Sequence, residues 1–217
     1  MKSTHQLIEE QVRRWDLSRQ EIKEEKTLPV ITLSREPGSG GKLVAKAVAD
    51  ELGLDIFHHD IIDTMAADAD TSSRIIRTLD ERGVSMLEDW VSAAINDRYL
   101  WPDEYAQVMM RVIGTIGRHG KAIIVGRGAN FVLPPENRFR VRILAPLELR
   151  VNRVAETFGV ARKEAKKRVL RTESDRRAFV RKYFHSDIRD PNNYDMILNT
   201  GTLAIDSATA AICSAVG

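Results

Sequence analysis

Cysteine is nearly absent from this sequence, since Cys213 is the only one among 217 residues. A lone cysteine forms no internal disulfide and offers no cysteine cluster for a metal, which suits a reducing compartment. Apolar runs of membrane-spanning length are missing too, and the start, Met1 to His5, is too polar for a secretory signal. We therefore predict a cytoplasmic protein with no membrane partner.

An excess of one charge is also missing. Lys and Arg number 33 against 31 Asp and Glu, a formal net charge of +2, and such a mild balance gives no nucleic-acid signature by itself. The sequence has no internal repeat and no low-complexity tract. Its hydrophobic content of 43% suits one globular domain, with room for a smaller lid or insert.

The most informative segment is 29–42, where an apolar strand runs through a glycine-rich turn into a helix expected over 43–52. Glycines let backbone N–H groups approach an anion closely, and the helix start adds free donors and the positive end of its dipole. A lysine at the rim supplies a mobile cation. We predict a nucleoside-triphosphate site at Gly38, Ser39, Gly40, Gly41 and Lys42.

The match of this turn to the P-loop pattern Gly-x-x-x-x-Gly-Lys-[Ser/Thr] is incomplete, and two registers are open. If Gly41-Lys42 is the Gly-Lys pair, Glu36 stands at the first glycine and Leu43 at the hydroxyl residue. If Gly40 is the second glycine, Arg35 stands at the first and a glycine at the lysine position. Neither register supplies a Ser or Thr to hold magnesium. A tight strand–helix turn without a ligand is the alternative interpretation.

Apolar segments typical of strands alternate with helical segments over residues 28–217. Strands are expected at 30–33, 55–57, 122–125, 139–144 and 194–199. Residues 59–119 are expected to be helical, with interruptions near Gly83 and at 101–103. Alternation of this kind predicts an α/β fold with a parallel sheet covered on both faces, which binds ligands at the carboxyl ends of its strands.

Residues 1–27 are predicted to form a helical extension before the first strand. Its helix, over 5–26, carries apolar residues spaced for one face: Leu7, Ile8, Val12, Trp15 and Leu17. The extension either packs back on the domain, which is the more ordinary outcome, or contacts a partner subunit and forms a homodimer.

Two further motifs follow expected strands. Gly126-Arg127-Gly128 places an arginine between glycines at a strand end, where it can clamp a phosphate or be a solvated turn. His58-His59-Asp60 follows the second strand. Adjacent histidines rarely bind one cation, so a substrate-contacting or solvated turn is favoured there over a metal site.

The helix expected over 161–184 is dense in charge. Such a run is usually a solvated face, and without an aromatic stacking platform we expect no nucleic-acid partner. Because it lies between the fourth and last strands, residues 160–190 suit a mobile lid that supplies arginines to a migrating phosphoryl group.

In combination, three segments resemble the cytidylate kinase-like branch of the nucleoside-monophosphate kinases: Ser34–Lys42, Ile123–Gly128 and Tyr194–Thr200. The resemblance covers about residues 28 to 215. It implies a three-layer P-loop kinase fold with a five-stranded parallel sheet, a helical acceptor-binding region at 59–119 and an arginine-rich lid.

The resemblance also implies roles for individual residues. The glycine turn would hold ATP, with Lys42 catalytic, and Arg127 and Asp60 would bind the acceptor. Arg176 and Arg181 resemble the catalytic arginines of the lid. Mg²⁺ would be held mainly by phosphates and water, with no metal site made by the protein. Val125 and Gly128 replace two acidic residues that true cytidylate kinases have beside this arginine, so their usual cytosine contact is missing.

The leading hypothesis is an ATP-dependent kinase that phosphorylates a nucleoside monophosphate, with CMP or dCMP as the first acceptor to consider. A kinase for a different small molecule and a nucleotide-binding regulator with weak or no kinase activity are the alternatives. An RNA-binding module is ranked last, because acidic residues such as Glu164 and Glu173 partly balance the basic helix.

Overall fold

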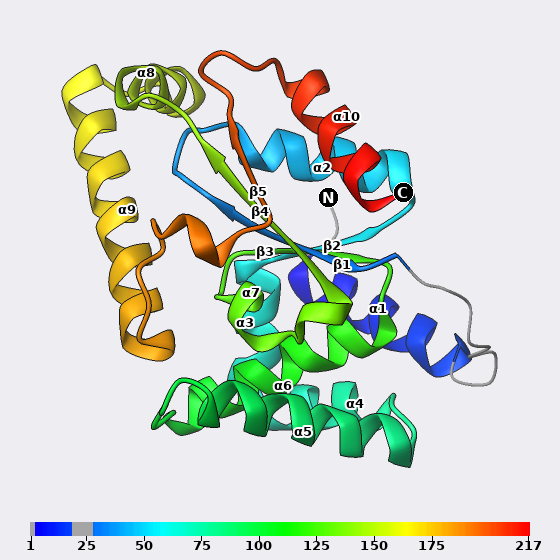
Figure 1. Cartoon of the computed structure of the whole chain (residues 1–217). Helices are drawn as coiled ribbons and strands as arrows, with labels where there is room; N and C mark the ends of the chain where they lie inside the picture. Colours follow the sequence, from blue (N-terminus) through cyan, green and yellow to red (C-terminus); the bar gives the residue numbers. More distant parts are fainter. Residues whose placement is uncertain (1–2, 19–27) are drawn as a thin grey trace.

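A computed structural model of the chain describes residues 3–18 and 28–217. Its centre is a five-stranded sheet in the order β2-β3-β1-β4-β5, with every neighbouring pair parallel (Figure 1). The strands are β1 (Val30–Arg35), β2 (Asp55–His58), β3 (Ala122–Val125), β4 (Arg138–Leu144) and β5 (Met196–Asn199). The expected α/β fold and parallel sheet are therefore confirmed.

Two layers of helices cover the sheet. One face is covered by α2 (Gly41–Leu52) and α10 (Ile205–Val216), which pack against each other. On the other side lie α1 (Thr4–Ser18), α3 (His59–Ala67), α4 (Ala69–Arg77), α5 (Glu81–Asn96), α6 (Glu104–His119) and α7 (Ala129–Val132). Helices α8 (Leu147–Phe158) and α9 (Arg162–Phe184) pack together beside the sheet, and two 3₁₀ turns, Pro135–Asn137 and Pro191–Asn193, complete the chain. These layers give a three-layer architecture.

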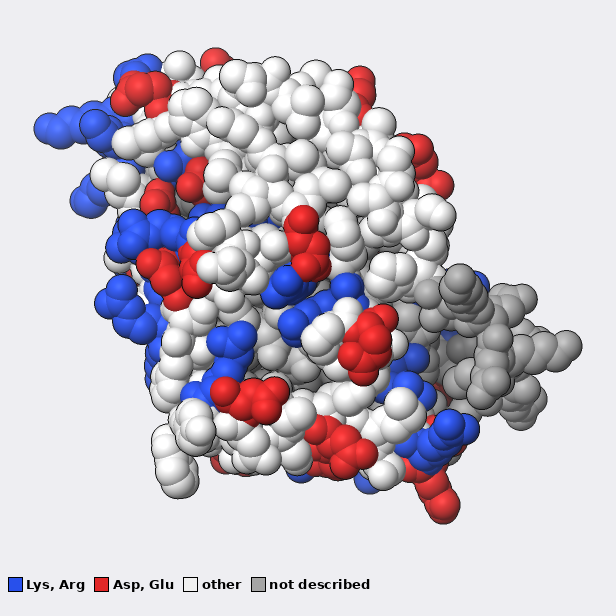
Figure 2. All heavy atoms as spheres, in the orientation of Figure 1, with Lys and Arg blue, Asp and Glu red and all other residues white. Residues whose placement is uncertain are grey.

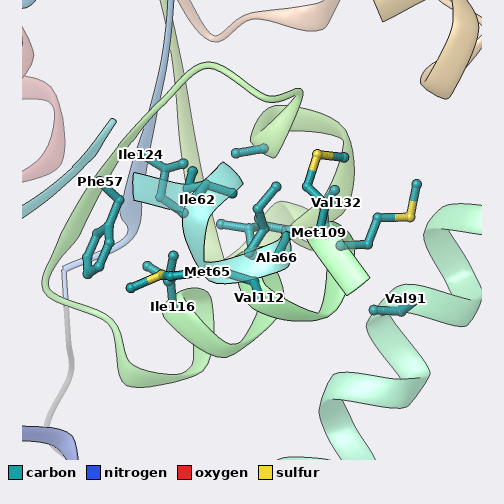
Figure 3. Close-up of a cluster of buried hydrophobic side chains, with 14 of the residues drawn as sticks. Phe57, Ile62, Met65, Ala66, Val91, Met109, Val112, Ile116, Ile124 and Val132 are labelled. Atoms are coloured by element: carbon teal, nitrogen blue, oxygen red, sulfur yellow. The ribbon is translucent and has the colours of Figure 1, made fainter. Parts of the chain in front are cut away.

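Successive side chains of β3 belong to two different hydrophobic cores, one on each face of the sheet. Ile123 and Val125 belong to the cluster under α2 and α10, whereas Ile124 belongs to the cluster under α3 and α6. Successive side chains of a strand point to opposite faces, so a continuous apolar run is needed when both faces are covered. Figure 3 shows the second cluster, in which Ile124 lies near Phe57 and Ile62.

Strand register brings the two glycine-containing turns together. Leu33 of the central strand β1 pairs with Val125 of β3, and the Gly126 amide donates to the Leu33 carbonyl over 3.1 Å. Parallel strands end at the same edge of a sheet, so the turns that follow β1 and β3 begin side by side.

Aspartate caps divide the helical region at 59–119. Asp68, Asp80 and Asp103 each precede a helix and accept a hydrogen bond from the backbone N–H three residues later, which satisfies one of the free donors of the first turn. The interruption expected near Gly83 lies at residues 78–80 instead. Gly83 is inside the first turn of α5, and its amide donates to Asp80 over 2.7 Å.

Helix α1 packs back on the domain. Ile8, Val12 and Trp15 are buried in the core under the sheet, as expected, but Leu7 and Leu17 are 42% and 71% exposed. The expected apolar face was therefore too wide, since only a narrow stripe of a short helix reaches the core. The rest of that expected helix, at 19–26, lies outside the described residues, and a homodimer through α1 stays a prediction.

No helix in the described ranges is long and apolar enough to cross a membrane. The longest helix, α9, has 23 residues, but its sequence is dominated by Lys, Arg and Glu.

The docking of α1 buries an imidazole and should make stability depend on pH. The rings of His119 and Trp15 stack with centroids 4.3 Å apart, and burial, aided by the charge of Arg118, lowers the pKa of His119 to about 4. Unfolded chain binds a proton on this residue below about pH 6.5, whereas the folded chain does not, so stability falls as pH drops from 6.5 towards 4. We expect this residue alone to cost roughly 2 kcal/mol between pH 7 and pH 5.

Urea unfolding of the parent and His119→Gln at several pH values measures this cost. The variant keeps a polar side chain near Thr78, whose hydroxyl lies 2.7 Å from His119 Nε2, but does not titrate. The difference in free energy of unfolding between the parent and the variant should change by roughly 2 kcal/mol from pH 7 to pH 5. A difference that stays constant over this range would contradict the prediction.

Candidate active site

The turn between β1 and α2 is built so that backbone amides remain free. Gly38 and Gly40 have φ values of +79° and +77°, a region that glycine enters at little cost. A Cβ at Gly38 would also lie 2.5 Å from the Arg150 carbonyl oxygen. Within the described residues, no hydrogen bond occupies the amides of Gly40, Gly41 or Lys42. Free amides at a helix start form an anion site.

Ser39, the remaining residue of the turn, is held through its backbone. Its carbonyl accepts a hydrogen bond from Thr200 Oγ1 over 2.5 Å, at the end of β5, and its amide donates to the Glu36 carbonyl over 3.2 Å. The Ser39 hydroxyl is fully buried and has no partner within the described residues. The turn is therefore fixed to strand ends on both sides.

Glu36 braces the turn through a network that the sequence analysis did not predict. Its carboxylate accepts from the Ala145 amide over 3.2 Å and pairs with Arg150 Nε at 3.2 Å and with Arg142 Nη2 at 3.8 Å. Arg150 also pairs with Glu173 of α9 at 3.1 Å. Nearly buried arginines thus tie the glycine turn to α8 and α9, and their charges are balanced by these carboxylates.

A cavity of about 390 Å³ opens at the ends of β1 and β3 beneath α9. Its wall combines the end of β1 and the turn after β3 with apolar and charged side chains, among them Arg35, His59, Arg127, Asp175, Arg176 and Phe179. Figure 2 shows Lys and Arg side chains gathered on the side of the molecule that carries α9, with acidic residues between them. The volume suits a small-molecule ligand.

Arg127 stands in a strained turn at this cavity. It has a φ of +53° between Gly126 at +93° and Gly128 at +67°, and a left-handed arginine costs of order 1 kcal/mol. Its guanidinium is ion-paired with Asp63 of α3 and lies 4.9 Å from the Phe179 ring centroid. Backbone strain held by several contacts is typical of functional sites.

Asp63 in turn accepts a hydrogen bond from the Tyr105 hydroxyl over 2.8 Å. Burial, together with this hydrogen bond, raises the pKa of Tyr105, so the phenol stays a donor. Three helices, α3, α6 and α9, therefore orient Arg127. Sequence analysis missed Asp63, Tyr105 and Phe179, although Asp63 stands one helical turn after the Asp60 that it selected.

Positive charges without enough counter-charge converge on the cavity. Arg176 Nη1 donates to the Arg35 carbonyl over 2.7 Å, and burial, then the charges of Arg127 and Arg142, lower the pKa of Arg176. Burial, then the charge of Arg176, lowers the pKa of Arg35 to about 10. Both remain cations at pH 7, and clustered cations of low exposure favour a bound anion such as phosphate.

Three other predicted site residues are exposed on helices outside the lining of the cavity. Lys42 is exposed in the first turn of α2, and Asp60 is exposed in the first turn of α3. Arg181 is exposed on α9 and does not line the cavity.

Burial, then the charge of Arg35, lowers the pKa of both His58 and His59, so these imidazoles are neutral at pH 7. The structure thus brings Arg127 and Arg176 together and leaves Arg181 apart.

A parallel sheet whose central strand runs through a glycine-rich turn into a helix is the arrangement of P-loop nucleotide-binding proteins. A family model described as "Cytidylate kinase-like family" matches residues 30–202. The chain belongs to this family and is a nucleotide kinase.

Named relatives and a solved structure agree with this assignment. A cytidylate kinase of Ignicoccus hospitalis is 27% identical over 85% of this chain and 97% of its own length. One from Natronomonas pharaonis is 30% identical, covering 86% of this chain and 88% of its own. The crystal structure of an uncharacterized protein from Eubacterium ventriosum superimposes with a TM-score of 0.70 and 25% identity, covering 87% and 98% of the two chains.

Proposed function

We propose that this kinase transfers the γ-phosphate of ATP to a nucleoside monophosphate bound in the 390 Å³ cavity, with CMP or dCMP as the preferred acceptor. The observation that carries the proposal is the position of this cavity. Its wall joins the end of β1, the strand that leads into the glycine turn, to Arg127 and Arg176, so an acceptor phosphate held here lies at the strand edge from which the glycine turn begins.

Most of the predicted residues have a role in this reaction. The free amides of Gly40, Gly41 and Lys42 and the Lys42 side chain hold the ATP phosphates, and Arg127 holds the acceptor phosphate. An acceptor oxygen attacks the γ-phosphorus, the bond to the β–γ bridging oxygen breaks, and ADP leaves. Arg176 stabilises the charge that spreads over the transferred group. Arg181 contributes only if α9 changes position.

Magnesium would be held by the phosphates and water. Across the described residues no group of three His, Cys, Asp or Glu side chains is placed to hold a metal ion. Neither register of the glycine turn provides a hydroxyl, because Lys42 or Leu43 stands at that position. In this proposal the protein contributes cations around the Mg²⁺–ATP complex.

The choice of a cytidine nucleotide rests on two observations. Relatives that match most of this chain are named cytidylate kinases. Carboxylates lie on α3 near the cavity, Asp63 paired with Arg127 and the exposed Asp60, where they can accept a hydrogen bond from an exocyclic amine. They would replace the acidic residues that are absent on either side of Gly126-Arg127.

An ADP-release assay tests the proposal with CMP, dCMP, UMP, AMP and non-nucleotide acceptors, with ATP hydrolysis in the absence of acceptor subtracted. We expect kcat/KM for CMP or dCMP to exceed that for AMP by at least tenfold, a difference of about 1.4 kcal/mol. Turnover with a non-nucleotide acceptor alone would overturn the nucleotide part. Tight ATP binding without turnover of any acceptor would favour the regulator.

A further inference from the structure

The structure distinguishes between the two registers of the glycine turn. Gly40 is the N-cap of α2 and has a φ of +77°, so it is the residue whose backbone requires glycine directly before the helix. Gly41 is already helical and its backbone makes no such demand. Gly40 is therefore the second glycine of the P-loop pattern, and Gly41 stands where the pattern has its lysine.

Residue 41 is glycine for a different reason, because any side chain there would collide with Arg35. A Cβ on Gly41 would lie 2.7 Å from the Cβ of Arg35 and 3.1 Å from its Cδ. The direction in which a P-loop lysine would leave the helix is thus filled by the side chain of Arg35. Arg35 itself stands at the first glycine position of the pattern in this register. A cation therefore occupies that glycine position, and Gly41 occupies the lysine position.

Arg35 is a buried cation without a bonded partner. Its exposed fraction is 8%, and no hydrogen bond or ion pair joins its guanidinium to another residue of the described ranges. It lines the cavity, and its Nη1 lies 4.0 Å from the position of a Cβ on Gly126. The guanidinium therefore reaches from the glycine turn towards the turn of Arg127.

An unpaired buried charge is costly, and natural proteins keep one where a ligand completes it. Arg35 packs its aliphatic part against Gly41, and its guanidinium lies within the field of Arg176; a guanidinium at this place has the chemistry of a phosphate site.

We propose that Arg35 is the phosphate-binding cation of this kinase and takes the place of the P-loop lysine, reaching the β- and γ-phosphates of ATP from the strand side of the turn. This assignment rests on the proposed function, because it requires ATP at the glycine turn. Lys42, which is exposed, is the outer of two cations in this arrangement.

Calorimetric titration with Mg²⁺–ATP in the absence of acceptor tests the assignment with four variants. Arg35→Met removes the charge but keeps the apolar bulk, and it should raise the Kd for ATP by at least tenfold. The exchange Arg35→Gly with Gly41→Lys restores the first glycine and the lysine of the pattern, and it should bring the Kd back to within about threefold of the parent. Lys42→Ala should weaken binding less than Arg35→Met does, because its side chain is solvated.

Lys46→Ala is the matched control. It removes an exposed cation of α2 that pairs with Asp50, and it should leave the Kd for ATP unchanged. Thermal melting of Arg35→Met separates binding from folding: a phosphate-binding arginine predicts a melting temperature equal to or above that of the parent, since an unpaired buried charge is removed.

Three results would overturn the assignment. An unchanged Kd for ATP in Arg35→Met would mean that the guanidinium does not contact the phosphates. A lower melting temperature with a proportionate loss of binding would make Arg35 a structural residue. If the parent itself does not bind ATP, the proposed function fails and the assignment fails with it, whereas absence of turnover alone leaves the titrations decisive.

Discussion

Gly128→Ala should destabilise the folded protein by about 3 kcal/mol or more, from overpacking and left-handed strain combined. Gly128 has a φ of +67°, and an added Cβ would overlap the ring of Phe184, lying 2.6 Å from Cζ and closer still to Cε2. Phe184 is fully buried at the end of α9 and stacks on Phe131, so moving its ring disturbs this packing. Urea unfolding with a constant m-value measures the loss.

Gly53→Ala and Gly159→Ala are matched controls for this prediction. These glycines have φ values of +64° and +61°, but nothing lies within 4 Å of an added Cβ at either position. Each should therefore lose only the backbone contribution, about 1 kcal/mol. An equal loss at all three positions would show that the contact with Phe184 is absorbed by movement and that only the backbone angle matters.

Arg127→Ala should raise the acceptor KM about a hundredfold, equivalent to about 3 kcal/mol for a lost bidentate phosphate contact. Arg127→Lys keeps the charge but loses the planar fork, and should raise this KM about tenfold. The KM for ATP should change little in both variants, because Arg127 lies in the turn after β3 and is proposed to hold the acceptor phosphate. Steady-state kinetics with each substrate varied in turn measure the two effects.

Arg111→Lys is a matched control. Arg111 of α6 forms a partly exposed ion pair with Glu88 of α5, and the substitution should leave both KM values unchanged. Asp63→Asn tests the positioning of Arg127. It removes the ion pair but keeps an acceptor for Tyr105, and we expect a smaller rise in the acceptor KM than in Arg127→Ala. An equal loss of affinity for ATP and acceptor in the Arg127 variants would instead mean that this arginine supports the whole cleft.

The sequence by itself determined those features that depend on neighbouring residues. The apolar run 122–125 required a strand covered on both faces, and the structure buries all four of its residues. The alternation of strands and helices predicted a parallel sheet, and the glycines of 38–41 predicted a tight turn between a strand and a helix. The family followed from three short segments, because each combines a strand end with the residues of the turn after it.

Only the tertiary structure decided how distant residues meet. The register of the glycine turn was decided by the left-handed backbone of Gly40 directly before α2, and the Arg35 side chain fills the space beside Gly41. The ion pair between Arg127 and Asp63 joins residues 64 positions apart, and Glu36 is bound by arginines more than a hundred positions away.

From the sequence alone, Arg176 and Arg181 could not be told apart, because both are arginines of the same predicted helix. A helix turns by about 100° per residue, so five residues separate two directions, and the packing of α9 on the rest of the chain determined which arginine faces the cavity. The strand order β2-β3-β1-β4-β5 creates these contacts, and no local pattern of residues encodes them.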